Sequence, residues 1–125
     1  EYAARSGGRS EKWSGTSSES SLGEYAWYDK NAGGKTHPVG QKRPNGLAIY
    51  DMSGNVWEWC ADWYGEKYYS QSSRDNPRGP SGDSGRVGRG GSWDVNASYC
   101  RAANRSGGTP GYRRGYLGFR LARTP

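Results

Sequence analysis

Short stretches in which apolar and polar residues alternate supply most of the predicted regular structure of this chain. Alternation with a period of two predicts β-strands. In the final stretch, three apolar residues should share one face of a strand, with Arg120 on the opposite face. The predicted strands are Leu47–Asp51, Val56–Trp59, Arg86–Trp93 and Leu117–Arg123, and the apolar residues of the last are Leu117, Phe119 and Leu121.

The segments between these strands are rich in turn-forming residues. Glu1–Arg5 is typical of the last turn of a helix that Ser6, Gly7 and Gly8 end. Arg9–Lys42 is polar and without period, which predicts a long loop anchored by its aromatic residues Trp13, Tyr25, Trp27 and Tyr28. We expect Ala61–Tyr69 to be loop or short helix, Ser70–Gly85 loop, Asn96–Arg105 short helix or turn, and Ser106–Tyr116 loop.

Composition favours one small folded domain with an aromatic core. Only 31% of the 125 residues are hydrophobic, which excludes a conventional aliphatic core. The chain nevertheless has 6 Trp and 10 Tyr, and disordered chains are poor in aromatic residues. The 21 glycines indicate many turns and close backbone approaches. We therefore expect a folded, loop-rich domain.

Charge, histidine and cysteine content point to no specific chemistry on their own. The net charge of +6 would permit acidic partners, but no RNP, KH, helix-turn-helix or zinc-finger pattern favours nucleic acid. We expect the arginines to donate mainly to loop carbonyls, and His37, beside a Pro turn, to be structural. Cys60 and Cys100 form no metal motif, so we expect free buried thiols, with a single bridge as the alternative. No apolar run is long enough to span a membrane.

The stretch Tyr50–Trp59 combines buried-type aromatics with two acids, and the rest of the chain should be organised around it. Asp51 and Glu58 are costly to bury unless they are paired, hydrogen-bonded or bound to a cation. Two carboxylates and turn carbonyls are oxygen ligands that calcium accepts. From the spacing alone, surface acids flanking a tight turn at Met52–Asn55 are favoured over a bound cation, since no EF-hand-like pattern is present.

Five sequence blocks resemble the formylglycine-generating enzyme (sulfatase-modifying factor) family. They are EYAAR at Glu1–Arg5, PNGLAIYDMSGNVWEW at Pro44–Trp59, NPRGP at Asn76–Pro80, RVGRGGSW at Arg86–Trp93 and GFRLA at Gly118–Ala122. Their order and spacing match the family over roughly the last two thirds of the chain, a far more specific signal than one short motif. The resemblance implies an irregular, loop-rich α+β fold of the C-type lectin kind. Residues 1–125 would be the C-terminal portion of one such domain, with its N-terminal part missing or supplied elsewhere.

The resemblance also implies particular ligands. By position, structural calcium would be held by the Asp51 and Glu58 side chains and the Gly54 and Val56 carbonyls. The family's enzymes oxidise a sulfatase cysteine with oxygen and copper held by two cysteines. Here the second falls on Cys100 but the first falls on Val95, and one thiolate cannot form that soft two-ligand site. If the chain were an enzyme, Cys100, Ser92 and Trp57 would line its active site, but the departure at Val95 counts against catalysis and against copper.

A branch of the family, the variable proteins of diversity-generating retroelements, uses this fold to bind ligands. Arg89–Ala122 resembles their variable cassette, in which mutation of adenines in Asn codons cannot produce Lys, Glu, Gln, Met or Trp. All residues of those five types lie within Glu1–Trp93, and none lies in 94–125. The resemblance therefore implies a diversified ligand surface across 93–116. Its candidate residues are Trp93, Asp94, Val95, Asn96, Ser98, Tyr99, Asn104, Ser106, Thr109, Tyr112, Arg114 and Tyr116.

We therefore predict a non-catalytic domain that binds a protein or other macromolecular ligand on a calcium-stabilised scaffold. Rigid tyrosines with serine and glycine suit such a surface, since they offer contact area at a low entropy cost. Composition alone fits equally well with tyrosines that cap a loop-rich core. Two other functions remain open: a formylglycine-generating oxidoreductase fragment, and a scaffold subunit without a ligand of its own.

Overall fold

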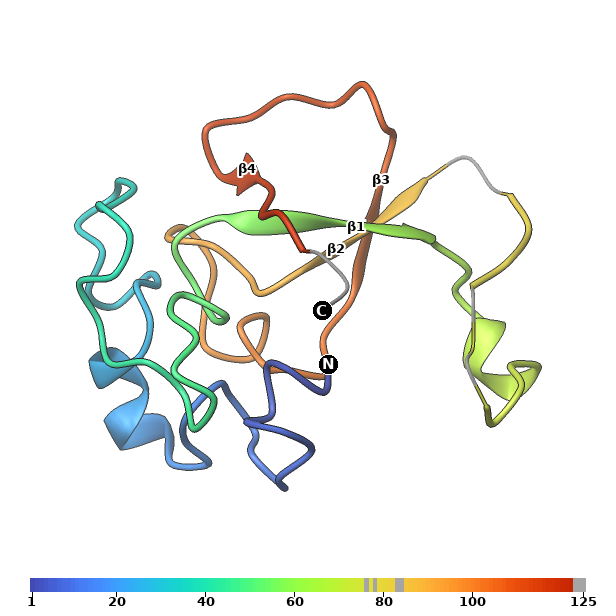
Figure 1. The fold of residues 1–125 in the computed structure, drawn as a ribbon. Helices are drawn as coiled ribbons and strands as arrows, with labels where there is room; N and C mark the ends of the chain where they lie inside the picture. The colour runs from blue at the N-terminus through green and yellow to red at the C-terminus, as the bar shows by residue number, and fades with distance from the viewer. Residues whose placement is uncertain (76, 78, 83–84, 123–125) are drawn as a thin grey trace.

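A four-stranded mixed sheet carries the C-terminal half of the chain, and irregular N-terminal segments lie below it (Figure 1). The computed structural model describes residues 1–75, 77, 79–82 and 85–122. The strand order is β3-β2-β1-β4, with β1–β2 and β2–β3 antiparallel and β1–β4 parallel. The strands are β1 (Trp57–Trp63), β2 (Arg86–Arg89), β3 (Ser106–Gly108) and β4 (Leu117–Gly118).

Helical structure in the described residues is limited to two 3-10 helices, η1 (Glu19–Glu24) and η2 (Tyr68–Ser70). Glu1–Arg5 forms a turn in which the Arg5 N–H donates to the Glu1 carbonyl at 2.9 Å, and 96–105 is also built of turns. No described helix is long and apolar enough to cross a membrane. The helical part expected of an α+β chain is therefore small.

Three of the predicted strands are confirmed, with changed bounds. β1 begins one residue later than predicted and runs on to Trp63, into the segment expected to be loop or helix. β2 ends at Arg89, because Gly90 and Gly91 adopt φ values of 94° and 74° that leave the strand conformation. β4 is only Leu117–Gly118. Residue 123 of the predicted last strand, and residues 76, 78, 83 and 84 of the predicted loop and its NPRGP block, lie outside the described residues.

Other expectations are wrong. Leu47–Asp51 is not a strand, because Ala48 and Asp51 have φ values of 58° and 56°, and the Ala48 N–H closes a turn onto the Asn45 carbonyl at 2.9 Å. Phe119 and Leu121 do not face a core, since they are 72% and 90% exposed. Ser106–Gly108, expected to be loop, is β3, whose residues pair with Arg86–Gly88 of β2. The strand β3 forms because its backbone pairs with β2, and such pairing requires no alternation of apolar and polar side chains.

The main apolar core lies among the N-terminal segments and the turn at 95–102. Among the predicted aromatic anchors, Trp13 and Tyr28 are buried, whereas Tyr25 and Trp27 are half-buried. The Trp13 indole N–H donates to the Ala97 carbonyl at 2.6 Å, which ties the first segment to this turn. The core cluster consists of Trp13, Leu22, Ala26, Tyr28, Ala97 and Cys100, with Val95 packed against it.

The turn at Ser53–Asn55 connects the core to the sheet, as the sequence predicted for this stretch. The Ser53 hydroxyl donates to the Cys100 carbonyl at 2.9 Å. The Asn55 side-chain amide exchanges two 3.0 Å hydrogen bonds with the His37 backbone. The Asn55 backbone carbonyl accepts a hydrogen bond from the Trp93 backbone N–H at 2.9 Å. The turn thereby fixes the start of β1 relative to residues 93–95, which carry part of the candidate site.

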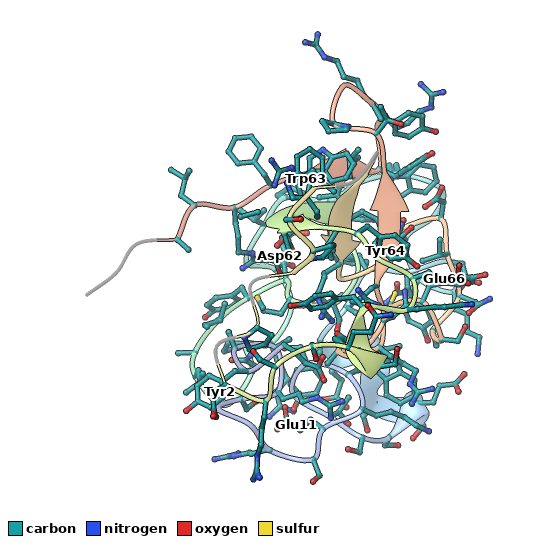
Figure 2. All side chains as sticks on the ribbon, turned by 90° about the vertical axis from the view of Figure 1, so that its right-hand side faces the viewer. Tyr2, Glu11, Asp62, Trp63, Tyr64 and Glu66 are labelled. Atoms are coloured by element: carbon teal, nitrogen blue, oxygen red, sulfur yellow. The ribbon has the colours of Figure 1, made fainter. Side chains whose placement is uncertain are left out.

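Arginines bridge loops in the way their abundance predicted. The Arg89 guanidinium donates to the Ala102 and Asn104 carbonyls, and Arg105 donates to the Gly65 carbonyl at 3.3 Å. Arginine and lysine also lie over aromatic rings: Arg86 is 3.7 Å from the centre of the Trp63 ring. Figure 2 shows Trp63 and Tyr64 at the sheet, well separated from Tyr2 and Glu11 of the N-terminal segment.

Candidate ligand-binding site

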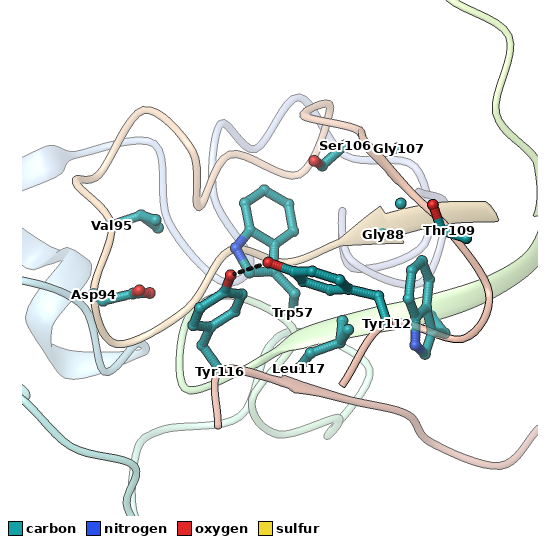
Figure 3. Close-up of a pocket in the computed structure, with 12 residues that line it drawn as sticks. Trp57, Gly88, Asp94, Val95, Ser106, Gly107, Thr109, Tyr112, Tyr116 and Leu117 are labelled. Carbon is teal, nitrogen blue, oxygen red and sulfur yellow. Dashed lines mark hydrogen bonds between the residues drawn. The ribbon is translucent and has the colours of Figure 1, made fainter. Parts of the chain in front are cut away.

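An aromatic pocket of about 500 Å³ lies between the sheet and the loop 109–116 (Figure 3). Its walls are mostly aromatic and aliphatic, with a few polar groups, as is usual for ligand pockets. The lining residues are Trp57, Trp59, Gly88, Asp94, Val95, Ser106, Gly107, Gly108, Thr109, Tyr112, Tyr116 and Leu117. We call this set the aromatic pocket.

Two tryptophans of β1 form the floor of the aromatic pocket. Trp57 and Trp59 are two residues apart, so their side chains project from the same face of the strand. Glycines on the neighbouring strands leave room for the indoles. Gly88 pairs with Trp59, and a Cβ added at Gly108 would lie 2.7 Å from the Trp59 ring. The absence of a side chain at Gly88 and at Gly108 therefore allows both indoles to lie on the sheet.

Two tyrosines from the loop 109–116 meet across the aromatic pocket. Their hydroxyl oxygens, in Tyr112 and Tyr116, are 3.0 Å apart (Figure 3). This hydrogen bond lowers the pKa of Tyr112 and raises the pKa of Tyr116. The Arg114 guanidinium lies 4.3 Å from the centre of the Tyr112 ring. The Trp57 N–H donates to the Tyr116 carbonyl at 2.7 Å, which holds the end of the loop on β1.

In the described part of the chain, Asp94 is the single charged residue that lines the aromatic pocket. The buried Ser92 hydroxyl donates to Asp94 Oδ1 at 2.5 Å, which orients the carboxylate. The next residue, Val95, packs against the core, and its carbonyl accepts from the Asp29 N–H at 3.1 Å. The turn that presents Asp94 is therefore anchored on both sides.

The structure gathers half of the predicted ligand-binding residues at the aromatic pocket. Those lining it are Asp94, Val95, Ser106, Thr109, Tyr112 and Tyr116. Those outside the lining are Trp93, Asn96, Ser98, Tyr99, Asn104 and Arg114. Two of the latter have local structural roles: Asn96 Oδ1 accepts from the Ser98 N–H and hydroxyl, and the Asn104 amide donates to the Tyr99 carbonyl at 3.1 Å.

Six lining residues were not predicted as ligand-binding residues: Trp57, which the sequence assigned only to the active site of an enzyme, and Trp59, Gly88, Gly107, Gly108 and Leu117. Trp59 could have been found from the sequence, because it is two positions from Trp57 and so shares its face of β1. The glycines carry no such signal, since β3 has no alternation and its place beside β2 depends on long-range pairing.

Of the residues that would line an oxidoreductase site, only Trp57 borders the aromatic pocket. Cys100 and Ser92 have no exposed surface. Burial raises the pKa of the Cys100 thiol to about 12, so the thiol is protonated near neutral pH. Cys60 is also a free thiol and is half-buried, so the alternative of a bridge between the two cysteines is wrong.

The four predicted calcium ligands lie together in a second cavity of about 360 Å³. This cavity, which we call the carboxylate cavity, is lined by Asp51, Gly54, Val56 and Glu58 among others. Neither the Gly54 nor the Val56 carbonyl accepts a hydrogen bond from another described residue. Asp51 Oδ2 accepts from the Gly40 N–H at 2.8 Å. Within the described part of the chain, no group of three or more His, Cys, Asp or Glu side chains is placed to hold a metal, so the carbonyls would be needed.

Arg120 is a further residue of the carboxylate cavity, and the sequence did not assign it there. Its guanidinium donates from Nε and Nη2 to the two Glu58 carboxylate oxygens, each at 2.5 Å. It also donates to the Tyr50 and Asp51 carbonyls at 3.0 and 2.9 Å. Arg120 thus satisfies the half-buried carboxylate of Glu58. It also joins the segment after β4 to Tyr50 and Asp51, which precede the turn at Ser53–Asn55.

Comparisons with known proteins agree with the resemblance found in the sequence. The chain is 48% identical over 90 residues to a formylglycine-generating enzyme of Streptomyces coelicolor, a match that covers 70% of this chain and 29% of the relative. Treponema denticola variable protein 1 has a similar structure, with a TM-score of 0.87 and 47% identity over 94% of this chain and 42% of that protein. PvdO of Pseudomonas aeruginosa has a TM-score of 0.72 and 28% identity, over 94% of this chain and 47% of that one.

The chain therefore spans less than half of the length of each of these proteins. The family described as the sulfatase-modifying factor enzyme 1-like domain matches all of residues 1–125. With the sequence blocks, the mixed sheet and these relatives in agreement, the chain belongs to the family of sulfatase-modifying factor enzyme 1-like domains.

Proposed function

We propose that this chain is a non-catalytic ligand-binding domain, and that the aromatic pocket holds its ligand. The observation that carries the proposal is the exposed aromatic pocket itself. It combines two indoles and two phenols, the side chains most often found at the energetic centre of interfaces. Tyr112 is 40% exposed, so its ring is available for contact and is not part of a core.

The similarity to Treponema denticola variable protein 1 supports this proposal. In the present chain, the loop that supplies Tyr112 and Tyr116 falls in the part of the sequence that lacks Lys, Glu, Gln, Met and Trp. The floor, by contrast, comes from Trp57 and Trp59, outside that part. A fixed floor of indoles below a variable rim would suit a scaffold that changes its ligand while keeping its fold. The fold itself we propose to be of the irregular C-type lectin kind.

A second candidate, an oxidoreductase fragment of the formylglycine-generating type, is favoured by the 48% identity to the Streptomyces coelicolor enzyme. The environment of Cys100 opposes it. A copper site of soft ligands needs thiolates, whereas burial keeps this thiol protonated and Val95 stands where a partner cysteine would be expected. We therefore place binding ahead of oxidation.

Structural calcium is part of the proposal. The donors of the carboxylate cavity fit this ion chemically, because they combine two carboxylates with two carbonyls that no described donor satisfies. When bound, calcium would cross-link the turn at Ser53–Asn55 to the start of β1. Arg120 competes with it for Glu58, so the guanidinium would share or release that carboxylate.

The proposal is tested by selecting displayed random short peptides on the immobilised domain. Enriched peptides should bind in solution and perturb the indole N–H resonances of Trp57 and Trp59. A sulfatase-derived cysteine peptide, incubated with the domain, copper and oxygen, should yield no formylglycine. Enrichment of no peptide, or only of peptides that leave both indoles unchanged, would contradict ligand binding at this pocket and favour a scaffold subunit. Formylglycine formation would establish the oxidoreductase.

A further inference from the structure

We infer that the aromatic pocket recognises an organic cation, the guanidinium or alkylammonium end of a side chain on a protein partner. This inference rests on the proposed function and adds the chemical class of the ligand group. Two features of the pocket carry it: uncovered indole faces on its floor and one oriented carboxylate at its edge.

The indoles of the aromatic pocket differ from three other tryptophans of this chain in having no cation over the ring. A lysine or arginine of the chain lies over three of the 6 tryptophans: Lys12 over Trp13, Lys42 over Trp27 and Arg86 over Trp63. In the described part of the chain, no cation lies over Trp57 or Trp59. Tryptophan is the best aromatic partner for a cation, so these two faces can accept one from outside.

The polar groups of the aromatic pocket fit the same ligand. Among the described residues of the lining, Asp94 supplies the only charge, and it is negative. One carboxylate oxygen is fixed by the Ser92 hydroxyl, while Oδ2 accepts no hydrogen bond from another described residue. A guanidinium or ammonium group could therefore lie against the rings and donate to this oxygen, forming a charge-assisted hydrogen bond.

Arg114 provides a way to distinguish a cationic ligand from an anionic one. Its guanidinium lies 4.3 Å from the Tyr112 ring, which shows that this ring already accepts a cation on the rim. Its positive charge would repel a cationic ligand and would attract an anionic one. Removal of Arg114 should therefore strengthen cation binding, whereas it would weaken binding of an anion. The net charge of +6 also repels a cationic ligand, but salt at physiological strength screens this charge beyond about 8 Å.

The test uses three blocked amino acids as probes, titrated into ¹⁵N-labelled protein at physiological salt. N-acetyl-arginine methylamide is the cation, the citrulline analogue is its neutral isostere and the glutamate analogue is the anion. Shifts are followed at the Trp57 and Trp59 indole N–H groups, assigned with Trp57→Phe and Trp59→Phe. The Trp13 indole N–H, which is buried and bonded to the Ala97 carbonyl, is the internal reference.

The arginine probe should shift both indoles saturably and bind at least about fivefold more tightly than the citrulline probe. Asp94→Asn should reduce arginine binding to the citrulline level, while Arg114→Ala should tighten it about twofold or more. Asp62→Asn is the matched control, because it removes the same charge from an exposed residue outside the lining; it should leave binding unchanged.

Equal binding of the arginine and citrulline probes, tighter binding of the glutamate probe, or no saturable shift with the arginine probe would overturn the inference. So would an Asp94→Asn variant that binds the arginine probe as tightly as the original protein. If a neutral or anionic probe binds at the same indoles as tightly as the arginine probe or more tightly, only the inference of a cation is overturned, and the proposed binding function stands. That function fails separately, in the peptide selection described above.

Discussion

The Tyr112 and Tyr116 hydroxyl oxygens lie 3.0 Å apart, so the middle of the loop 109–116 is joined to its C-terminal end at the aromatic pocket. The hydrogen bond links a residue 40% exposed to one that is half-buried above β1. The rim of the pocket thus has its own internal restraint, separate from the apolar core around Trp13 and Cys100.

The tyrosine pair should be visible in an alkaline titration. Its hydrogen bond lowers the pKa of Tyr112 from the ordinary value of 10.0, so Tyr112 should ionise first of the two as the pH rises. Tyr116→Phe removes the donor, and the pKa of Tyr112 should then rise. Ring resonances of labelled tyrosine report each ionisation. Tyr99→Phe, outside the pocket, should leave Tyr112 unchanged; an unaltered Tyr112 titration in Tyr116→Phe would contradict the paired geometry.

Cys100 should make the fold less stable at alkaline pH. Its pKa in the folded protein is about 12, against 9.0 for an ordinary thiol. The folded state therefore retains a proton that the unfolded state loses, and stability should fall between these two pH values by about 1.4 kcal/mol per pH unit. Cys100→Ala should show a shallower decline of unfolding free energy over the same range, measured by urea denaturation. Equal slopes would contradict the buried, protonated thiol.

Gly108→Ala should damage the floor of the aromatic pocket. The new Cβ would lie 2.7 Å from the Trp59 ring, so the indole or β3 must shift, at a cost of about 1–3 kcal/mol. Gly111→Ala is the control, because nothing lies within 4 Å of its added Cβ, and it should change stability by about 0.5 kcal/mol or less. Thermal unfolding of both variants checks the difference, which would vanish if Trp59 did not rest on Gly108.

Calcium should stabilise the domain through the carboxylate cavity. At about a hundredfold excess over its dissociation constant, a bound ion adds about 2.7 kcal/mol, so a chelator should lower the Tm. Glu58→Ala should abolish this response. Arg120→Gln should lower the Tm in chelator, because it removes bonds to Glu58 and two carbonyls, yet it should retain the response to calcium. If the unsubstituted protein has the same Tm in calcium and in chelator, the calcium site in the carboxylate cavity is excluded.

Sequence reasoning succeeded where local chemistry sets the structure. The buried turn at Ser53–Asn55 was predicted, because its turn-forming residues signal it directly. The strand β1, which follows this turn, and the strand β2, which precedes Gly90 and Gly91, were predicted from side-chain alternation and glycine positions. The four residues that the family resemblance implies as calcium ligands lie in one cavity, and half of the predicted ligand residues lie around one pocket.

Most of the errors arose where contacts between distant segments of the chain determine the structure, whereas the error at Leu47–Asp51 arose from the nearby Asn45. β3 is a strand because Gly107 and Gly108 pair with β2, and its sequence has no apolar alternation. Leu47–Asp51 alternates, yet hydrogen bonds to Asn45 turn it out of the strand conformation. The role of Arg120 at Glu58 depends on the parallel pairing of β4 with β1, across 62 positions of sequence. No local pattern could report that contact.

The central claim, that the aromatic pocket is the ligand site, is tested most directly by calorimetric titration of a selected peptide. The three proteins compared are the original, Tyr112→Ala combined with Tyr116→Ala, and Tyr99→Ala. Tyr99 is a matched tyrosine, 50% exposed but outside the lining. We predict that the double variant loses about 2 kcal/mol of affinity or more, with a nearly unchanged Tm, and that Tyr99→Ala binds like the original. Full affinity in the double variant, or its unfolding, would contradict the claim.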